Sequence, residues 1–129
     1  GLARAMSRCS GDGSDKISVA AALLRDAMMA HPELVAGETR ACTELMRAAP
    51  GVAIKTGAEA VFVAIIPDQN LGISVKIEDG ATRASEAVIT ALLIRFGLLN
   101  AAHPAALKRL GPISNWDGLQ TGRITVVLD

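Results

Sequence analysis

The chain is poor in aromatic residues: its 129 residues include no tyrosine, one tryptophan and two phenylalanines. A core must therefore be built from Ala, Val, Ile, Leu and Met, and such small side chains fill space only where elements approach closely. Hydrophobic residues still make up 50% of the sequence, which argues against disorder. The length suits one compact domain over residues 1–129.

An excess of charge of one sign is also missing, because 13 basic residues balance 13 acidic ones. We therefore expect no nucleic-acid partner. No apolar run reaches the ~18–20 residues of a membrane span, so we expect no membrane insertion. The two cysteines, Cys9 and Cys42, do not have the spacing of metal ligands, so we expect this chain alone to bind no metal or other cofactor. We also expect both thiols to be reduced, as in a cytoplasmic protein.

The first residues have helical spacing without a start signal. Gly1 to Arg8 carries no initiator methionine and no capping residue, while Leu2, Ala5 and Met6 follow a helical period. We expect this segment to be the interior of a helix, cut within a longer protein.

Three helical patterns come before residue 50. Pro32 ends the second pattern and Pro50-Gly51 closes the third, while Asp15 or Ser14 is the expected N-cap of the second. The expected buried stripes are Ile17, Ala20, Ala21, Leu24, Ala27 and Met28 in one helix, and Ala41, Cys42, Leu45, Met46 and Ala49 in another.

After Val52 the hydrophobic period changes to two. Val61–Ile66 is apolar on both sides, which predicts a central strand covered on both faces, and Leu71–Ile77 alternates like a half-exposed antiparallel strand. A helix with the stripe Ala84, Ala87, Val88, Ala91 and Ile94 should follow and end at Gly97. We expect a last strand at Ile124–Leu128 and an indole of Trp116 that fills a gap in the core. The order predicts an α+β fold with an antiparallel sheet packed with helices.

Lys55 is the first candidate functional residue, since it emerges from an apolar strand just before Gly57, which has no Cβ to block a close approach. Partial burial would lower its pKa by desolvation, and such a lysine acts as a base or holds an anion. The alternative is an edge-strand lysine that prevents edge-to-edge pairing. Glu38 and Arg40, in the loop between two helices, either line a cleft or are solvated charges near a helix N-terminus.

Several motifs together carry a family resemblance that covers roughly residues 1–120. PELVAG, C-T-x-L-M-R, K-T-G-A-E, GISVKIEDGATRA and NWDG occur in an order and spacing that resemble the C-terminal half of the bacterial asparaginase II family, the Rhizobium-type L-asparaginases. The resemblance implies a serine β-lactamase-like or glutaminase-like fold. It also implies hydrolysis of the amide substrate L-asparagine by a serine–lysine apparatus, which other serine–lysine amidohydrolases (a glutaminase or a penicillin-recognising relative) share.

Carried over by position, the resemblance makes Lys55 the catalytic lysine. It places Thr56, Gly57, Ala58 and Glu59 along the substrate edge, together with Arg40, and puts Cys42 near the site. The family's S-x-x-K element and a possible zinc site belong to its N-terminal half, which this chain does not match, so we expect the isolated chain to be catalytically incomplete.

Two positions depart from the family pattern. Thr39 and Ala60 stand where glycine is expected, and their added bulk should narrow the site. A non-enzymatic reading also stays open, in which the chain self-associates as a homo-oligomer, a dimer for instance, through an uncovered sheet face.

Overall fold

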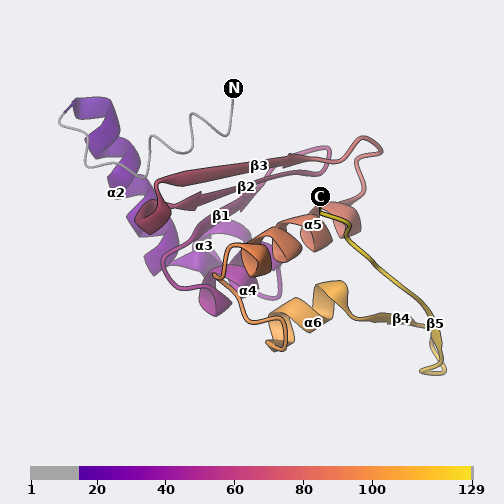
Figure 1. Cartoon of the computed structure of the whole chain (residues 1–129). Helices are drawn as coiled ribbons and strands as arrows, with labels where there is room; N and C mark the ends of the chain where they lie inside the picture. Colours follow the sequence, from indigo (N-terminus) through magenta and orange to yellow (C-terminus); the bar gives the residue numbers. More distant parts are fainter. Residues whose placement is uncertain (1–14, 129) are drawn as a thin grey trace.

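The computed structural model describes residues 15–128, which form an α+β arrangement of helices against a small antiparallel sheet (Figure 1). The predicted helix over Gly1 to Arg8 lies outside the described residues. Within them, no helix is both long and apolar enough to cross a bilayer. The predicted α+β class is confirmed.

The main sheet has three strands in the order β1-β2-β3: β1 (Ala53–Thr56), β2 (Val61–Ile66) and β3 (Leu71–Lys76). Both pairs are antiparallel, and the turn η1 (Pro67–Gln69) joins β2 to β3. The central position of β2 is therefore confirmed. The two faces of β2 are not covered equally. Phe62, Ala64 and Ile66 on one face are all buried, whereas on the other face Ile65 is buried and Val61 and Val63 are only half-buried.

Helices α4 (Ala41–Ala48) and α5 (Thr82–Arg95) cover the well-buried face of the sheet (Figure 1). The predicted stripe of α4 is confirmed, since Cys42 and Leu45 are almost completely buried. The short helix α6 (Pro104–Leu110) packs outside α4 and α5 and forms a further layer.

The buried face of α5 differs from the predicted stripe. Ser85 and Thr90 are fully buried, whereas Ala84 and Ile94 are only half-buried. The hydroxyls of Ser85 and Thr90 donate to the carbonyls of Thr82 (2.9 Å) and Glu86 (2.6 Å) in the same helix. Because these hydroxyls find partners within the helix, their burial carries little penalty, and packing against the sheet and α6 sets the rotation of the helix.

Helix α2 (Lys16–Ala30) forms as predicted, but the buried stripe expected between Ile17 and Met28 is wrong. The side chain of Asp15 caps it as predicted, but none of its residues is buried, and Ile17 and Leu24 are 82% and 68% exposed. The apolar positions repeat at helical spacing in the sequence, but few of the described residues pack against them. The loop expected after it contains the short helix α3 (Pro32–Ala36).

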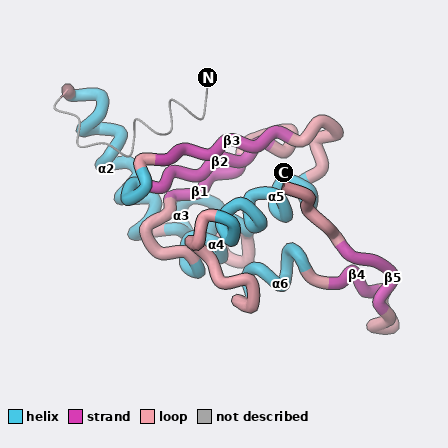
Figure 2. Tube along the Cα trace, in the orientation of Figure 1, coloured by secondary structure: helices cyan, strands magenta, loops and turns pink. Residues whose placement is uncertain are grey.

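The C-terminal part corrects two further predictions. Strands β4 (Pro112–Ser114) and β5 (Gln120–Arg123) form a separate hairpin that projects from the body (Figures 1 and 2). Ile124–Leu128 is extended without strand pairing and returns to α5, where Arg95 donates to the Leu128 carbonyl at 3.1 Å. Trp116 is fully exposed at the hairpin tip, so it fills no gap in the core.

Candidate functional site

Lys55 lies on the edge strand β1, opposite Val63 of β2. Its side chain is exposed, and its Nζ donates to the carbonyl of Thr56 at 2.6 Å. The partial burial that would tune this amine as a base is therefore not supplied by the described residues.

Thr56 connects the same strand end to helix α4. Its backbone N–H donates to the Sγ of Cys42 at 3.2 Å, while its own Oγ1 lies 3.4 Å from the carbonyls of Gly57 and Val61. Burial raises the pKa of the Cys42 thiol, against the opposing effects of the Thr56 hydrogen bond and the positive charges of Lys55 and Arg40. Cys42 is therefore a packed, neutral thiol that anchors the strand.

Gly57, Ala58 and Glu59 form the turn from β1 to β2. The N–H of Gly57 donates to the Val61 carbonyl at 2.7 Å, and a Cβ added to Gly57 would lie 3.2 Å from that of Val61. A side chain at this position would therefore press on Val61 of its own hairpin, while the outer side of Gly57 is exposed. Glu59 adopts a left-handed backbone, with φ of 55°.

Arg40 is the N-cap residue of α4 and is exposed. Its charge and that of Lys55 on β1, 15 residues further along the chain, both act on the Cys42 thiol, so both cations lie near Cys42. Glu38 takes no part in this arrangement, because its carboxylate pairs with Arg47 through two hydrogen bonds of 2.7 and 2.8 Å.

Thr39 and Ala60, where the resemblance predicts glycine, both have left-handed backbones, with φ of 64° and 54°. This conformation favours glycine, which explains why glycine is the expected residue at both positions. Thr39 is exposed and narrows nothing, whereas Ala60 is 5% exposed and close-packed.

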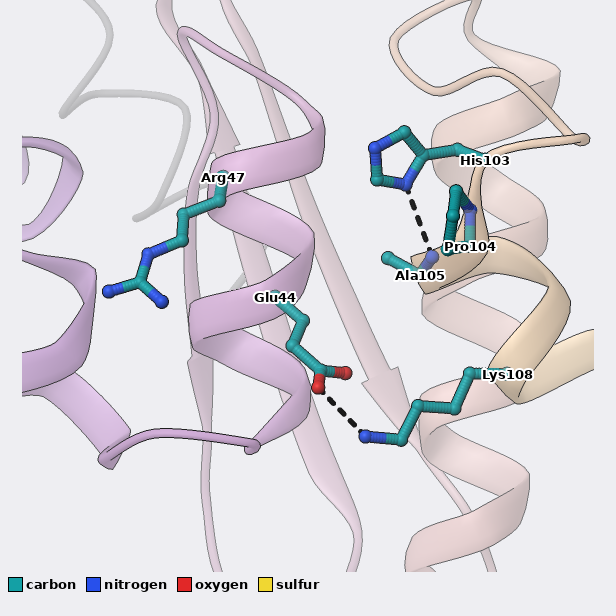
Figure 3. Close-up of a pocket in the computed structure, with 6 residues that line it drawn as sticks. All are labelled: Glu44, Arg47, His103, Pro104, Ala105 and Lys108. Carbon is teal, nitrogen blue, oxygen red and sulfur yellow. Dashed lines mark hydrogen bonds and ion pairs between the residues drawn. The ribbon is translucent and has the colours of Figure 1, made fainter.

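A cavity of about 310 Å³ opens between α4 and α6 (Figure 3). Arg47 points away from the α6 side of it, and neither Lys55 nor Arg40 lines it. The lining residues are Glu44, Arg47, His103, Pro104, Ala105 and Lys108.

Glu44 joins α4 to α6 at this cavity. Its two oxygens accept hydrogen bonds from Lys108 Nζ (2.7 Å) and from a terminal nitrogen of Arg109 (2.6 Å). The Arg109 side chain is 3% exposed, and its Nε faces Glu86 of α5 at 3.7 Å. Burial opposes ionisation of Glu44, but the hydrogen bonds and charges of Lys108 and Arg109 outweigh it and hold the pKa of this carboxyl below its usual range. The cluster is an ionic contact between three helices, in which Lys108 and Arg109 donate to Glu44 while the buried Nε of Arg109 has no hydrogen-bond partner among the described residues.

The described residues contain no group of side chains that could hold a metal ion. Between residues 15 and 128, no three His, Cys, Asp or Glu side chains come together as ligands. We therefore assign no step to a metal held by these residues.

The family model of L-asparaginase II matches residues 1–126. The chain belongs to the L-asparaginase II family. No curated protein matches the sequence. Family membership gives this asparaginase II chain an asparaginase-type function, and it accounts for the motif at Lys55–Glu59, which the structure places on a strand end and its turn.

Sequence reasoning missed the ionic contact of this L-asparaginase II chain. Glu44 and Arg109 are 65 residues apart, and no local spacing relates them. One signal was available, since Arg109 shares the apolar face of its helix with Ala105, and a buried arginine requires an acidic partner.

Proposed function

We propose that this L-asparaginase II chain contributes to the hydrolysis of L-asparagine to L-aspartate and ammonia, and that Lys55 is its catalytic residue. The observation that supports this is the exposed position of Lys55, within its K-T-G-A-E motif, on the edge strand β1, where its charge and that of Arg40 both act on the Cys42 thiol. Thr56, Gly57, Ala58 and Glu59 follow as the substrate edge. Two cations at one region suit the carboxylate of an amino-acid substrate.

The reaction requires a nucleophile in addition to a cation. Attack on the side-chain carbonyl of asparagine forms an acyl intermediate and releases ammonia, and water then releases aspartate. Among the described serines, Ser18 and Ser85 donate to Asp15 and Thr82, and no hydrogen bond joins a serine to Lys55. We infer that none of the described serines is the nucleophile and that the described residues are catalytically incomplete by themselves.

Lys55 also needs other residues to cover its side chain before it can act as a base. A solvated ammonium accepts no proton, so a role as a base requires a neighbouring surface that removes water from the amine of Lys55. On this proposal the whole domain has the serine β-lactamase-like, glutaminase-like fold of the Rhizobium-type enzymes and works in a reducing cytoplasm, which suits the free thiol of Cys42.

The test is ammonia release from L-asparagine by the full-length protein with Lys55→Met. We expect activity to fall by about 10²–10⁴, the usual contribution of a positioned acid–base group. Lys76→Met is the matched control, because Lys76 is an exposed lysine of the same sheet and lies on β3 rather than β1. Near-normal turnover by a folded Lys55→Met protein would remove Lys55 from the mechanism.

A substrate panel separates the related reactions. Asparagine, glutamine and a chromogenic β-lactam distinguish an asparaginase from a glutaminase or a penicillin-recognising relative. Preferential hydrolysis of glutamine or the β-lactam would replace the asparagine proposal while keeping the serine–lysine chemistry.

The non-enzymatic alternative rests on the half-buried Val61 and Val63 of the second sheet face. An apolar face of this kind favours self-association. Ammonia release by the full-length protein argues against this alternative as the whole function of the chain.

A further inference from the structure

A single buried hydroxyl joins helix α4 to the short helix α3. Thr43 is fully buried, and its Oγ1 donates to the Gly37 carbonyl at 2.6 Å and lies 3.1 Å from the Pro32 carbonyl. Pro32 is the first residue of α3 and Gly37 is its C-cap, so one side chain of α4 contacts both ends of this helix. A helix of five residues is not stable by itself, and contacts of this kind decide its position.

The loop that leaves α3 depends on the same contact. It passes through Thr39, with φ of 64°, and ends at Arg40, the N-cap residue of α4. A left-handed threonine costs free energy and persists only where its surroundings fix the backbone. A second side-chain contact of the loop, between Glu38 and Arg47, is exposed to solvent and contributes little. The buried hydroxyl of Thr43 is therefore the stronger restraint on the backbone that carries Arg40.

Adjacent residues of α4 hold the two parts of the candidate site. Cys42 accepts the backbone N–H of Thr56 at 3.2 Å and so fixes the strand end that carries Lys55. Thr43, the next residue, fixes the loop that ends at Arg40. Because successive side chains of a helix point about 100° apart, the first turn of α4 reaches both the sheet and the α3 loop. The positions of both cations thus depend on this one turn.

We propose that the Thr43 hydroxyl is a positioning group, which holds Arg40 where its guanidinium binds the carboxylate of the amino-acid substrate. This inference rests on the proposed function, in which Arg40 lies along the substrate edge with Lys55. Thr43 itself is buried and acts only through the loop. An arginine binds a carboxylate best through two parallel hydrogen bonds, so a shift of the loop weakens binding even though the charge is kept.

The experiment measures kcat and KM for asparagine in the full-length protein with Thr43→Val, which keeps the branched shape of the side chain and removes its hydroxyl. We expect KM to rise about five- to thirty-fold with kcat within about three-fold of the wild type, because substrate binding is weakened and the chemical step is not. Thr43→Ser keeps the hydroxyl and should restore most of the lost affinity. Failure of the serine variant to restore KM would overturn the role of the hydroxyl.

Thr90→Val is the matched control. Thr90 is equally buried, but its hydroxyl donates to the Glu86 carbonyl within helix α5 at 2.6 Å. The same substitution there should lower the free energy of unfolding while KM stays at the wild-type value. A similar rise of KM in both variants would overturn the proposal, since it would follow from lost stability alone.

A double-mutant cycle tests whether Thr43 acts through Arg40. Arg40→Met should raise KM by itself, and Thr43→Val should then add little, because the guanidinium that it displaces is gone. Independent effects of the two substitutions on KM would overturn the proposal, and so would an unchanged KM in Thr43→Val.

The positioning role and the proposed function fail in different ways. Loss of turnover in Lys55→Met, together with an unchanged KM in Thr43→Val and Arg40→Met, would keep Lys55 in the mechanism and remove Thr43. A full-length protein that hydrolyses no asparagine would overturn the proposed function and, with it, the substrate role of Arg40. Amide hydrogen exchange over residues 38–41 needs no activity and should accelerate in Thr43→Val but not in Thr90→Val. Unchanged exchange would show that the hydroxyl does not hold the loop.

Discussion

The backbone N–H of Thr56 donates to the buried Sγ of Cys42, which attaches the strand end that carries Lys55 to the first turn of α4. Sulfur is a weak acceptor, yet this contact fixes the last residue of an edge strand. The position of the candidate site therefore depends on a buried side chain of the neighbouring helix.

Replacement of this thiol is the first prediction. Cys42→Ala leaves the Thr56 N–H without its acceptor and opens a small void, so we expect a loss of about 1–2 kcal/mol in the free energy of unfolding. Amide hydrogen exchange at Thr56 should accelerate while the amides of central β2 keep their protection. Unchanged exchange at Thr56 would show that the sulfur does not hold the strand end.

The ionic contact at Glu44 predicts an acid dependence. Because the folded state lowers the pKa of Glu44, its contribution to stability is complete above the ordinary glutamate value of about 4.3 and is lost as pH falls through the lower folded value. The stability of the wild type should therefore fall on acidification, and Glu44→Gln should remove part of this slope.

At neutral pH, Glu44→Gln should also cost about 2–3 kcal/mol. It leaves Glu86, at 3.7 Å, as the one described acidic partner of the buried Arg109 guanidinium, which otherwise keeps its hydrogen bond to the Ala105 carbonyl. Glu38→Gln is the matched control, since Glu38 pairs with Arg47 on the exposed surface and should matter little. Equal effects of the two variants in urea denaturation would contradict the assigned role of Glu44.

Thr39 and Ala60 have left-handed backbones, so we expect glycine at either position to stabilise the fold. Thr39→Gly and Ala60→Gly relieve backbone strain at φ of 64° and 54°, and each should raise the free energy of unfolding by about 0.5–1 kcal/mol after the entropy cost of glycine. Ala58→Gly, two residues before Ala60 and without a positive φ, is the control and should destabilise slightly. Destabilisation by all three substitutions would refute the strain at Thr39 and Ala60.

His103 predicts a capping effect at the cavity. Its Nδ1 accepts from the N–H of Ala105 at 3.1 Å, so it serves as the N-cap of α6. His103→Ala should cost about 1 kcal/mol in thermal or urea unfolding, and His103→Asn should restore most of the loss. Failure of the asparagine variant to restore stability would assign the effect of His103 to packing instead of capping.

The sequence identified the elements whose signals are local. The alternation at Leu71–Lys76, the central character of Val61–Ile66, the stripe of α4 and the stop at Gly97 all follow from periods and breakers within a few residues, and the structure agrees with them. The K-T-G-A-E motif likewise pointed to the family that the chain belongs to.

The predictions that failed concern which neighbour covers an element. Ile17 and Leu24 lie on an apolar helical pattern, and Ile124–Leu128 alternates like a strand, but periodicity cannot supply a partner surface or a partner strand. For Trp116 the same reasoning assumed that a large ring must be buried, whereas its position on a protruding hairpin exposes it.

The sequence by itself determined the α+β class, the central strand and the family, because the hydrophobic period and the order of motifs can be read from neighbouring residues in the chain. Only the tertiary structure decided that Lys55 is exposed, that Arg109 meets Glu44 across 65 residues, and that α5 buries two hydroxyls. These outcomes depend on which distant surfaces come together, since burial and charge pairing are set by neighbours in space and not by neighbours in sequence.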